Sequence, residues 1–376
     1  MAGEPAMAGA IAPATAQSAS AGDWSRRLRA DSEYVVLPVA ALIVAFLAFA
    51  LFLLAIGKSP ADFISYVWKG GFGTAFSFQN TLQRSAPLIL TALAVAIPAR
   101  IGLIIIGGEG ALVLGGFAAA VVALPLVGIL PPWLTLPIMF VVAAAVGAAW
   151  IGLAGLMRTL RGVNETISSL LLNYVGIAIM NFFVEGALRD ATNPNKPSTK
   201  PIGDAYMVGK IPGTDVHWGF AVGILLAIAL YILMTRTTFG FAARMTGGNP
   251  RAALAQGLPV GRIMLTCTLI AGACAGIAGF YEVAAIQGRA NASLAAGYGF
   301  TGILVSFLAR HNPLVIVPVA ILFGGLVASG GLIQRRMDLP DATVLVLQGL
   351  IFIILLASET LYGRFAIFRP REGSSA

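Results

Sequence analysis

Charged side chains are scarce in this sequence. Of its 376 residues only 11% are Asp, Glu, Lys or Arg, whereas 58% are hydrophobic. Soluble domains average about 25% charged and about 45–50% apolar residues, so this composition excludes a large water-soluble protein and indicates a polytopic membrane protein. Acidic residues are the scarcest, and the net charge of +8 is scattered between apolar runs. Without a contiguous basic patch, nucleic-acid binding is not expected.

Cysteine, histidine and catalytic motifs are also nearly absent. The two cysteines, Cys267 and Cys274, lie seven residues apart in an apolar run, which suits neither a CxxC redox pair nor a zinc site. The two histidines, His217 and His311, lie at predicted membrane edges on opposite sides. No GxxxxGK[ST], HExxH or GxSxG pattern occurs. The chain is therefore not expected to be an enzyme or to carry a P-loop, a metal or a cofactor, and transport remains.

Long apolar runs supply the secondary structure. A membrane span needs roughly 20 apolar residues, fewer where a helix is broken or re-entrant. The second and eighth runs are short, so the number of spans lies between eight and ten, and glycines at 102–110 interrupt the second and third. The fold class expected is all-α, a membrane helix bundle with broken or re-entrant segments. The ten predicted spans are 35–56, 86–99, 103–124, 134–157, 166–187, 218–235, 263–286, 298–309, 314–331 and 343–358.

Arginine gives the orientation. With ten spans and the N-terminal tail inside, fourteen arginines fall on the cytoplasmic side and five outside, although all five lysines fall outside. We therefore expect a disordered cytoplasmic tail at 1–33, a permease-like membrane domain at 34–360 and a cytoplasmic tail at 361–376. The polar segment 188–217 becomes an external loop, either solvated or a docking surface for an external partner. Segment 236–262 becomes a cytoplasmic loop.

Small residues recur in several spans. In AGACAGIAGF, Gly272 and Gly276 lie four residues apart and Gly279 lies near the same helical face. Such spacing predicts that a neighbouring helix approaches closely.

Glu109, in LIIIGGEGALVLGG, is the most informative polar residue in a predicted span. A charge near the centre of a span costs on the order of 2.5–3.5 kcal/mol, so this carboxylate needs a partner, a watery cavity or a proton. If a helix starts at Gly110, Glu109 lies at its positive end. A structural cap and a place in a translocation pathway both remain open. Glu282 and Gln287 are expected at the external membrane interface.

A second polar group lies in RGVNETISSLLLNY. Asn164 suits the N-cap of the fifth span, and Glu165 adds favourable charge to its first turn. Asn173 is deeper and shares a face with Ser169, four residues earlier. These two side chains either join neighbouring helices or, with Glu109, line the translocation pathway.

The cytoplasmic loop 236–262 contains four arginines and no acidic residue. Glycine and proline divide it into short pieces around one helix-prone fragment, RAALAQ. It is the region where a cytoplasmic partner is expected to bind.

Three stretches together resemble the permeases of bacterial ABC importers for simple sugars and nucleosides, which are related to ribose and branched-chain amino-acid permeases. IGGEGALVLGG is similar to their IGxEGxxxxG stretch, GVNETISSLLLNY to their GxNExISTxxLNY stretch, and GGNPRAALAQGLPVGR to their cytoplasmic coupling segment. Arg251 is a departure, because many ABC permeases have Glu there, although related permeases of this branch also lack it. The residues that the resemblance assigns to ATPase coupling are Gly248, Asn249, Arg251, Ala252, Ala253 and Gly257.

The resemblance implies a type II importer-like fold in a bacterial inner membrane with both termini cytoplasmic. It also implies a separate ATPase subunit that holds ATP and Mg, a second permease that is identical or different, and an extracytoplasmic binding protein. The cargo, nucleoside or simple sugar, stays open. The alternative function is a secondary transporter or channel for a small polar solute, which needs an ion or proton site at Glu109.

Overall fold

The structure is a computed structural model that describes residues 21–192, 195–340 and 342–359, and the described chain is helical. Residues 1–20 and 360–376 of the two expected tails lie outside the described residues. The helices are α1 Ala21–Ala55, α2 Pro60–Gly71, α3 Ala75–Ala99, α4 Gly108–Leu126, α5 Pro132–Arg161, α6 Glu165–Glu185, α7 Trp218–Arg236, α8 Thr238–Gly248, α9 Pro250–Ala255, α10 Val260–Tyr281, α11 Tyr298–Leu308, α12 Pro313–Met337 and α13 Ala342–Glu359. Short turns are η1 Asp204–Tyr206, the π-helical η2 Glu282–Gln287, and η3 Ala292–Leu294.

All ten predicted spans coincide with helices. Eight stretches in the described residues are long and apolar enough to cross a membrane, and 292–308 and 342–358 are shorter apolar helices. The predicted class, an all-helical multi-pass membrane protein, is confirmed.

The chain divides into two compact units. The described part of the first consists of residues 21–47 of α1 and 351–359 of α13; the second contains residues 48–350. In the first unit Leu37, Ala41 and Ala45 recur every four residues and are buried. The site described below lies entirely in the second unit.

Several boundaries differ from the prediction. α1 begins at Ala21, within the expected tail, where residues 21–33 are rich in helix formers such as Ala, Arg and Leu. α3 begins at Ala75 rather than at residue 86, because Thr74 accepts a hydrogen bond from the Ser77 N–H at 3.0 Å and caps it. Its first turns, AFSFQNTLQRS, are too polar for a hydropathy rule to detect. The short helices α2 and α8 were also missed.

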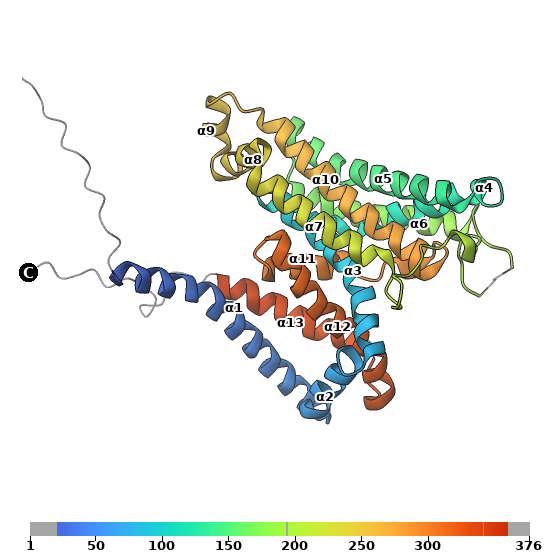
Figure 1. Ribbon diagram of the computed structural model, residues 1–376, viewed down its shortest axis with the longest axis horizontal. Helices are drawn as coiled ribbons and strands as arrows, with labels where there is room; N and C mark the ends of the chain where they lie inside the picture. Colours follow the sequence, from blue (N-terminus) through green and yellow to red (C-terminus); the bar gives the residue numbers. More distant parts are fainter. Residues whose placement is uncertain (1–20, 193–194, 341, 360–376) are drawn as a thin grey trace, which may run out of the picture. The chain divides into compact units, whose positions relative to one another are not determined.

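α10 lies at the centre of the second unit and packs against α3, α4 and α5 (Figure 1). A Cβ added at Gly272 would collide with the backbone of Gly147 in α5, and one at Gly279 with the backbone of Leu112 in α4. The predicted close helix approach is therefore confirmed.

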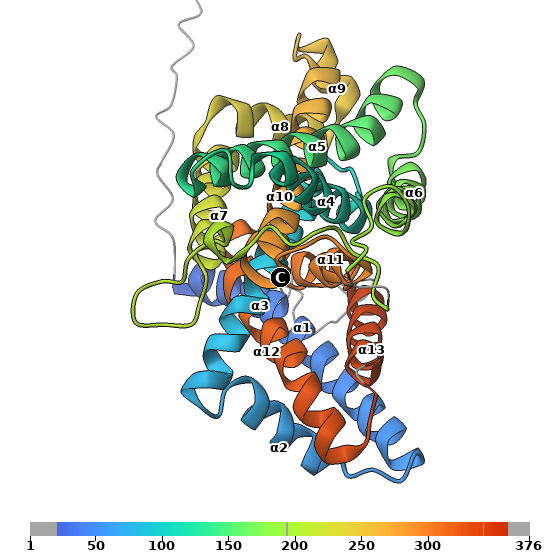
Figure 2. The same cartoon turned by 90° about the vertical axis from the view of Figure 1, so that its right-hand side faces the viewer.

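The ends of α10 carry different structures. α8 and α9 stand at its start, and the 188–217 loop covers its other end (Figures 1 and 2). That loop is tied down by backbone hydrogen bonds from Val208 N to Ala284 O at 2.6 Å and from Ile202 N to Gly288 O at 2.9 Å. The two segments predicted on opposite membrane sides thus lie at opposite ends of one helix.

Candidate functional site

Glu109 lies in the first turn of α4 and is 1% exposed. Its carboxylate accepts hydrogen bonds from the backbone N–H of Gly297 at 2.6 Å and of Gly299 at 2.5 Å, both at the start of α11. Gly297 has φ +84°, a left-handed conformation that disfavours a side chain. Glu109 therefore caps the N-terminus of another helix, where the free N–H groups and the helix dipole favour an anion.

Asn173 and Ser169 join α6 to the segment that precedes α4. The side chain of Asn173 accepts from Gly110 N and donates to Ile106 O, each at 2.7 Å. The Ser169 hydroxyl accepts from Ile106 N at 3.1 Å. Both side chains are buried, and their contacts satisfy the backbone of a non-helical stretch.

Asn164 and Glu165 form the start of α6. The Asn164 side chain accepts from the N–H of Thr166 at 3.0 Å and of Ile167 at 3.1 Å. Glu165 pairs with Arg158 of α5 at 3.3 Å. These contacts fix the α5–α6 turn.

The predicted coupling residues lie in and around α9. Asn249 caps α9 by accepting from the N–H of Arg251 and of Ala252, each at 3.1 Å. Gly257, with φ +80°, ends the helix in a Schellman turn, in which Leu258 N donates to Ala253 O at 3.0 Å.

Burial separates the coupling residues into two groups. Arg251 and Ala252 are exposed, whereas Ala253 is fully buried within the chain. The outward face of α9 also presents Leu254, which is 63% exposed and which the sequence did not single out. Gly248 and Gly257 have open space where a side chain would begin.

A buried contact links α8 to the turn between α11 and α12. Gly247 of α8 packs against the backbone of Arg100, and a Cβ at Gly247 would collide with the Arg100 carbonyl. The side chain of Arg100 in turn donates from Nε to His311 O at 3.2 Å. Burial, followed by the nearby Arg244, lowers the pKa of Arg100. Burial and then Arg100 lower the pKa of His311 to about 4. His311 is therefore neutral at pH 7 and contacts the Ser306 hydroxyl at 2.9 Å.

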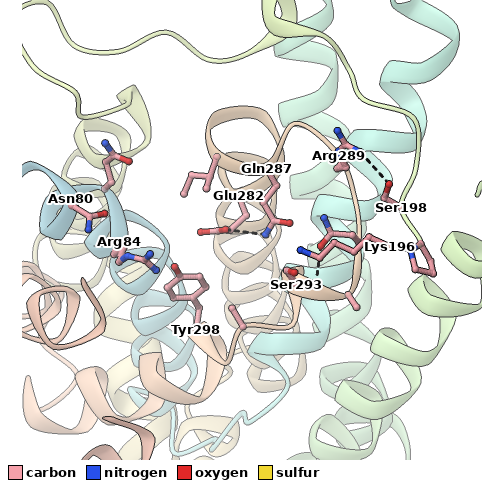
Figure 3. Close-up of a pocket in the computed structure, with 15 residues that line it drawn as sticks. Asn80, Arg84, Lys196, Ser198, Glu282, Gln287, Arg289, Ser293 and Tyr298 are labelled. Atoms are coloured by element: carbon pink, nitrogen blue, oxygen red, sulfur yellow. Dashed lines mark hydrogen bonds between the residues drawn. The ribbon is translucent and has the colours of Figure 1, made fainter. Parts of the chain in front are cut away.

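A cavity of about 600 Å³ opens between α3, η2 and the loops around residues 196–198 and 289–296. Figure 3 shows Glu282 and Gln287 on one side and Arg84 on the other. Eleven of its fifteen lining residues are polar or charged: Asn80, Gln83, Arg84, Lys196, Ser198, Glu282, Gln287, Arg289, Asn291, Ser293 and Tyr298. Both volume and lining suit a small polar ligand.

A second cavity of about 340 Å³ adjoins the first and shares Arg84, Ala296 and Tyr298 with it. Its other walls come from α11, α12 and α13, and include Thr301 and Gln348, whose side chains are hydrogen-bonded at 3.0 Å. The two cavities meet at Arg84 and Tyr298.

The sequence did not indicate that these residues line a cavity. Glu282 was expected at the membrane interface, but its side chain is buried, with 3% of the residue exposed. Arg84 was placed outside the membrane because the polar first turns of α3 were not recognised as helix. Glu109, Ser169 and Asn173 line neither of the two cavities. Their proposed contact with solute stays a prediction.

Comparison with known proteins identifies the family. Residues 77–356 match the model of the branched-chain amino acid transport system permease component. The chain is 33% identical to the glucose ABC transporter permease protein TsgB13 of Haloferax volcanii, over 90% of this chain and 92% of that protein.

The guanosine ABC transporter permease protein NupP of Bacillus subtilis is 29% identical, over 86% of this chain and 94% of that protein. The nucleoside ABC transporter permease protein NupB of Lactococcus lactis is 28% identical, over 85% of this chain and 90% of that protein. Together with the helical bundle, these matches show that the chain belongs to the branched-chain amino acid transport permease family and is the membrane-spanning permease component of an ABC importer. It is a transport protein rather than an enzyme.

Proposed function

We propose that this permease carries a nucleoside or a simple sugar through the pair of adjoining cavities. The observation that carries the proposal is that eleven of the fifteen residues lining the 600 Å³ cavity are polar or charged. A solute with several hydroxyl groups finds donors and acceptors there. The glucose, guanosine and nucleoside permeases among its relatives support the same solute class.

Transport is driven by partners. A separate ATPase subunit, which holds ATP and Mg, engages the α8–α9 segment, while this chain itself needs no cofactor. A second permease, identical or different, completes the membrane part, and an extracytoplasmic binding protein delivers solute at the 188–217 loop. ATP-driven closure of the ATPases shifts the bundle between inward- and outward-open states.

The proposed location is the cell (inner) membrane, embedded in lipid, with the N- and C-termini cytoplasmic. The arrangement of α8–α9 and the 188–217 loop at opposite ends of α10 supports this orientation.

The alternative function, a secondary transporter or channel, depends on an ion or proton site at Glu109. That carboxylate is hydrogen-bonded to two backbone N–H groups and lines neither of the two cavities, so the geometry of the described residues does not favour the alternative.

The test is uptake of labelled guanosine and glucose into proteoliposomes that contain this chain with an ATPase, a second permease and a binding protein from the same gene neighbourhood. We expect uptake of one of the two solutes only with ATP. Arg251→Ala and Gly257→Val should leave ATP hydrolysis running while uptake falls, whereas Arg335→Ala, at an exposed position outside the α8–α9 segment, should change neither. Uptake by this chain with no ATPase present would overturn the proposal.

A further inference from the structure

Unpartnered polar atoms are concentrated around the two cavities. In the described part of the chain six buried side-chain polar atoms lack a hydrogen-bond partner, and four belong to cavity residues: Arg84 Nε, Glu282 Oε1, Gln287 Oε1 and Gln348 Nε2. Buried polar groups in folded proteins almost always have partners. Such a concentration at one place indicates where the polar groups of a ligand bind.

Glu282 is the clearest of these groups. It begins the π-helical turn η2, a wide turn of a kind found frequently at functional sites. One carboxylate oxygen has a single long contact with Gln287 at 3.4 Å, and the other has none. The carboxylate points across the cavity toward Arg84 (Figure 3). Neither residue belongs to the two ion pairs found in the described residues.

Arg84 and Tyr298 form the neck between the cavities. The Arg84 guanidinium lies beside the Tyr298 hydroxyl (Figure 3). Tyr298 is the first residue of α11, whose backbone is held on one side by Glu109 and on the other by Thr91, with the Thr91 hydroxyl donating to Tyr298 O at 3.0 Å. The backbone of Tyr298 is therefore held in place where the two cavities adjoin.

The unpartnered groups include both hydrogen-bond donors and hydrogen-bond acceptors. Arg84 Nε and Gln348 Nε2 donate, and Glu282 Oε1 and Gln287 Oε1 accept. A hydroxyl group does both, so a solute with neighbouring hydroxyls satisfies all four. A carboxyl oxygen accepts hydrogen bonds from hydroxyl donors, and an aromatic ring offers an apolar face to a sugar or a base.

We propose that Glu282, Arg84 and Gln348 bind the hydroxyl groups of the solute at the neck between the two cavities while Tyr298 contacts its ring. This inference rests on the proposed function and adds to it the residues that select the solute. Glu282 and Arg84 hold the hydroxyls in the 600 Å³ cavity. Gln348 binds them in the adjoining 340 Å³ cavity.

The experiment compares solutes that differ by one hydroxyl. Maximal uptake of guanosine and of 2′-deoxyguanosine, or of glucose and 2-deoxyglucose, is measured in the complete transporter with Glu282→Gln. Because the binding protein is the same in both transporters, a change in the ratio between the paired solutes reports on the permease alone. We expect the maximal rate for guanosine or glucose to fall about tenfold and its preference over the deoxy compound to shrink.

Matched controls are Glu185→Gln, at an exposed position at the end of α6, and Arg335→Gln, which should keep both rate and preference. Gln348→Met is the second variant if Glu282→Gln does not fold, and it should also lower the rate and the preference. Equal loss of both paired solutes, or no loss, in a folded variant would overturn the inference while leaving the proposed function intact. If the unaltered transporter carries leucine and neither guanosine nor glucose, the proposed solute class fails first.

Discussion

Glu109 and Glu282 are two buried glutamates in opposite situations. Both are at most 3% exposed. Glu109 uses both oxygens on the backbone N–H groups of Gly297 and Gly299, while Glu282 has one long contact and one oxygen without a partner. The first lies at a contact between two helix starts, and the second lines a 600 Å³ cavity.

The difference shows how to separate architecture from function among buried polar residues. A carboxylate whose two oxygens both accept hydrogen bonds within the chain lowers the free energy of the fold. A carboxylate that faces a cavity with an unused oxygen costs stability, and that cost is compensated only when a ligand binds. The first two predictions below test this separation.

The largest effect on stability is expected for Glu109→Ala. Hydrogen bonds to a charged group contribute about 1.5–3 kcal/mol each, so losing both should lower the free energy of unfolding by about 3–6 kcal/mol. Thermal or denaturant unfolding of the purified protein in detergent measures it. Glu282→Ala is the matched control and should change stability little or raise it. A larger loss in the free energy of unfolding for Glu282→Ala than for Glu109→Ala would contradict the comparison.

A smaller loss is expected for Asn173→Ala. The variant leaves Gly110 N and Ile106 O without their side-chain partner, at about 1–3 kcal/mol each, so we expect a loss of about 2–6 kcal/mol in the same unfolding measurement. Asn181→Ala, on the same helix and only partly buried, serves as the control. If Asn173→Ala instead abolished transport in a protein of unchanged stability, Asn173 would belong with Glu282 rather than with Glu109.

Acidification should lower the free energy of unfolding through protonation of His311. Its folded pKa of about 4 lies below the value of about 6.5 in an unfolded chain, so the unfolded chain takes up the proton first as pH falls. Its contribution is fully present above about pH 6.5 and is lost as pH falls toward 4, with about 2 kcal/mol already lost at pH 5.

Unfolding between pH 7 and 5 checks this. His311→Asn, which suits the left-handed backbone at this position, should show a shallower loss of stability on acidification. Part of the loss remains, because burial also lowers the pKa of His217 to about 4. Identical pH profiles of variant and wild type would show that His311 is not buried as a neutral group.

The smallest effect is expected at Gly257. With φ +80°, an alanine there costs about 1 kcal/mol of the turn that ends α9. The same substitution at Gly261, in the first turn of α10 with nothing within 4 Å, should stabilise by up to about 1 kcal/mol. If alanine lowers the free energy of unfolding at Gly257 and raises it at Gly261, four residues away, the comparison extends from side chains to the backbone. Changes in the same direction at both positions would contradict it.

Much of the fold was readable because membrane spans and helix caps are local. Ten apolar runs predicted ten helices, and Asn164 and Asn249 cap α6 and α9, as local hydrogen bonding of Asn to the next turn dictates. The close packing around Gly272 and Gly276 also follows from spacing within one helix. The polar turns of α3 were not readable by hydropathy, and with them Arg84 was misplaced.

The sequence by itself determined the class of protein and the order of its spans, because these depend on burial of apolar runs. Only the tertiary structure decided what the polar residues do. Glu109 meets Gly297 and Gly299 across some 190 residues of chain, and Arg84, Glu282 and Gln348 come from three distant helical segments to line adjoining cavities. Whether a buried carboxylate is satisfied depends on atoms brought together by packing, and no local pattern encodes those.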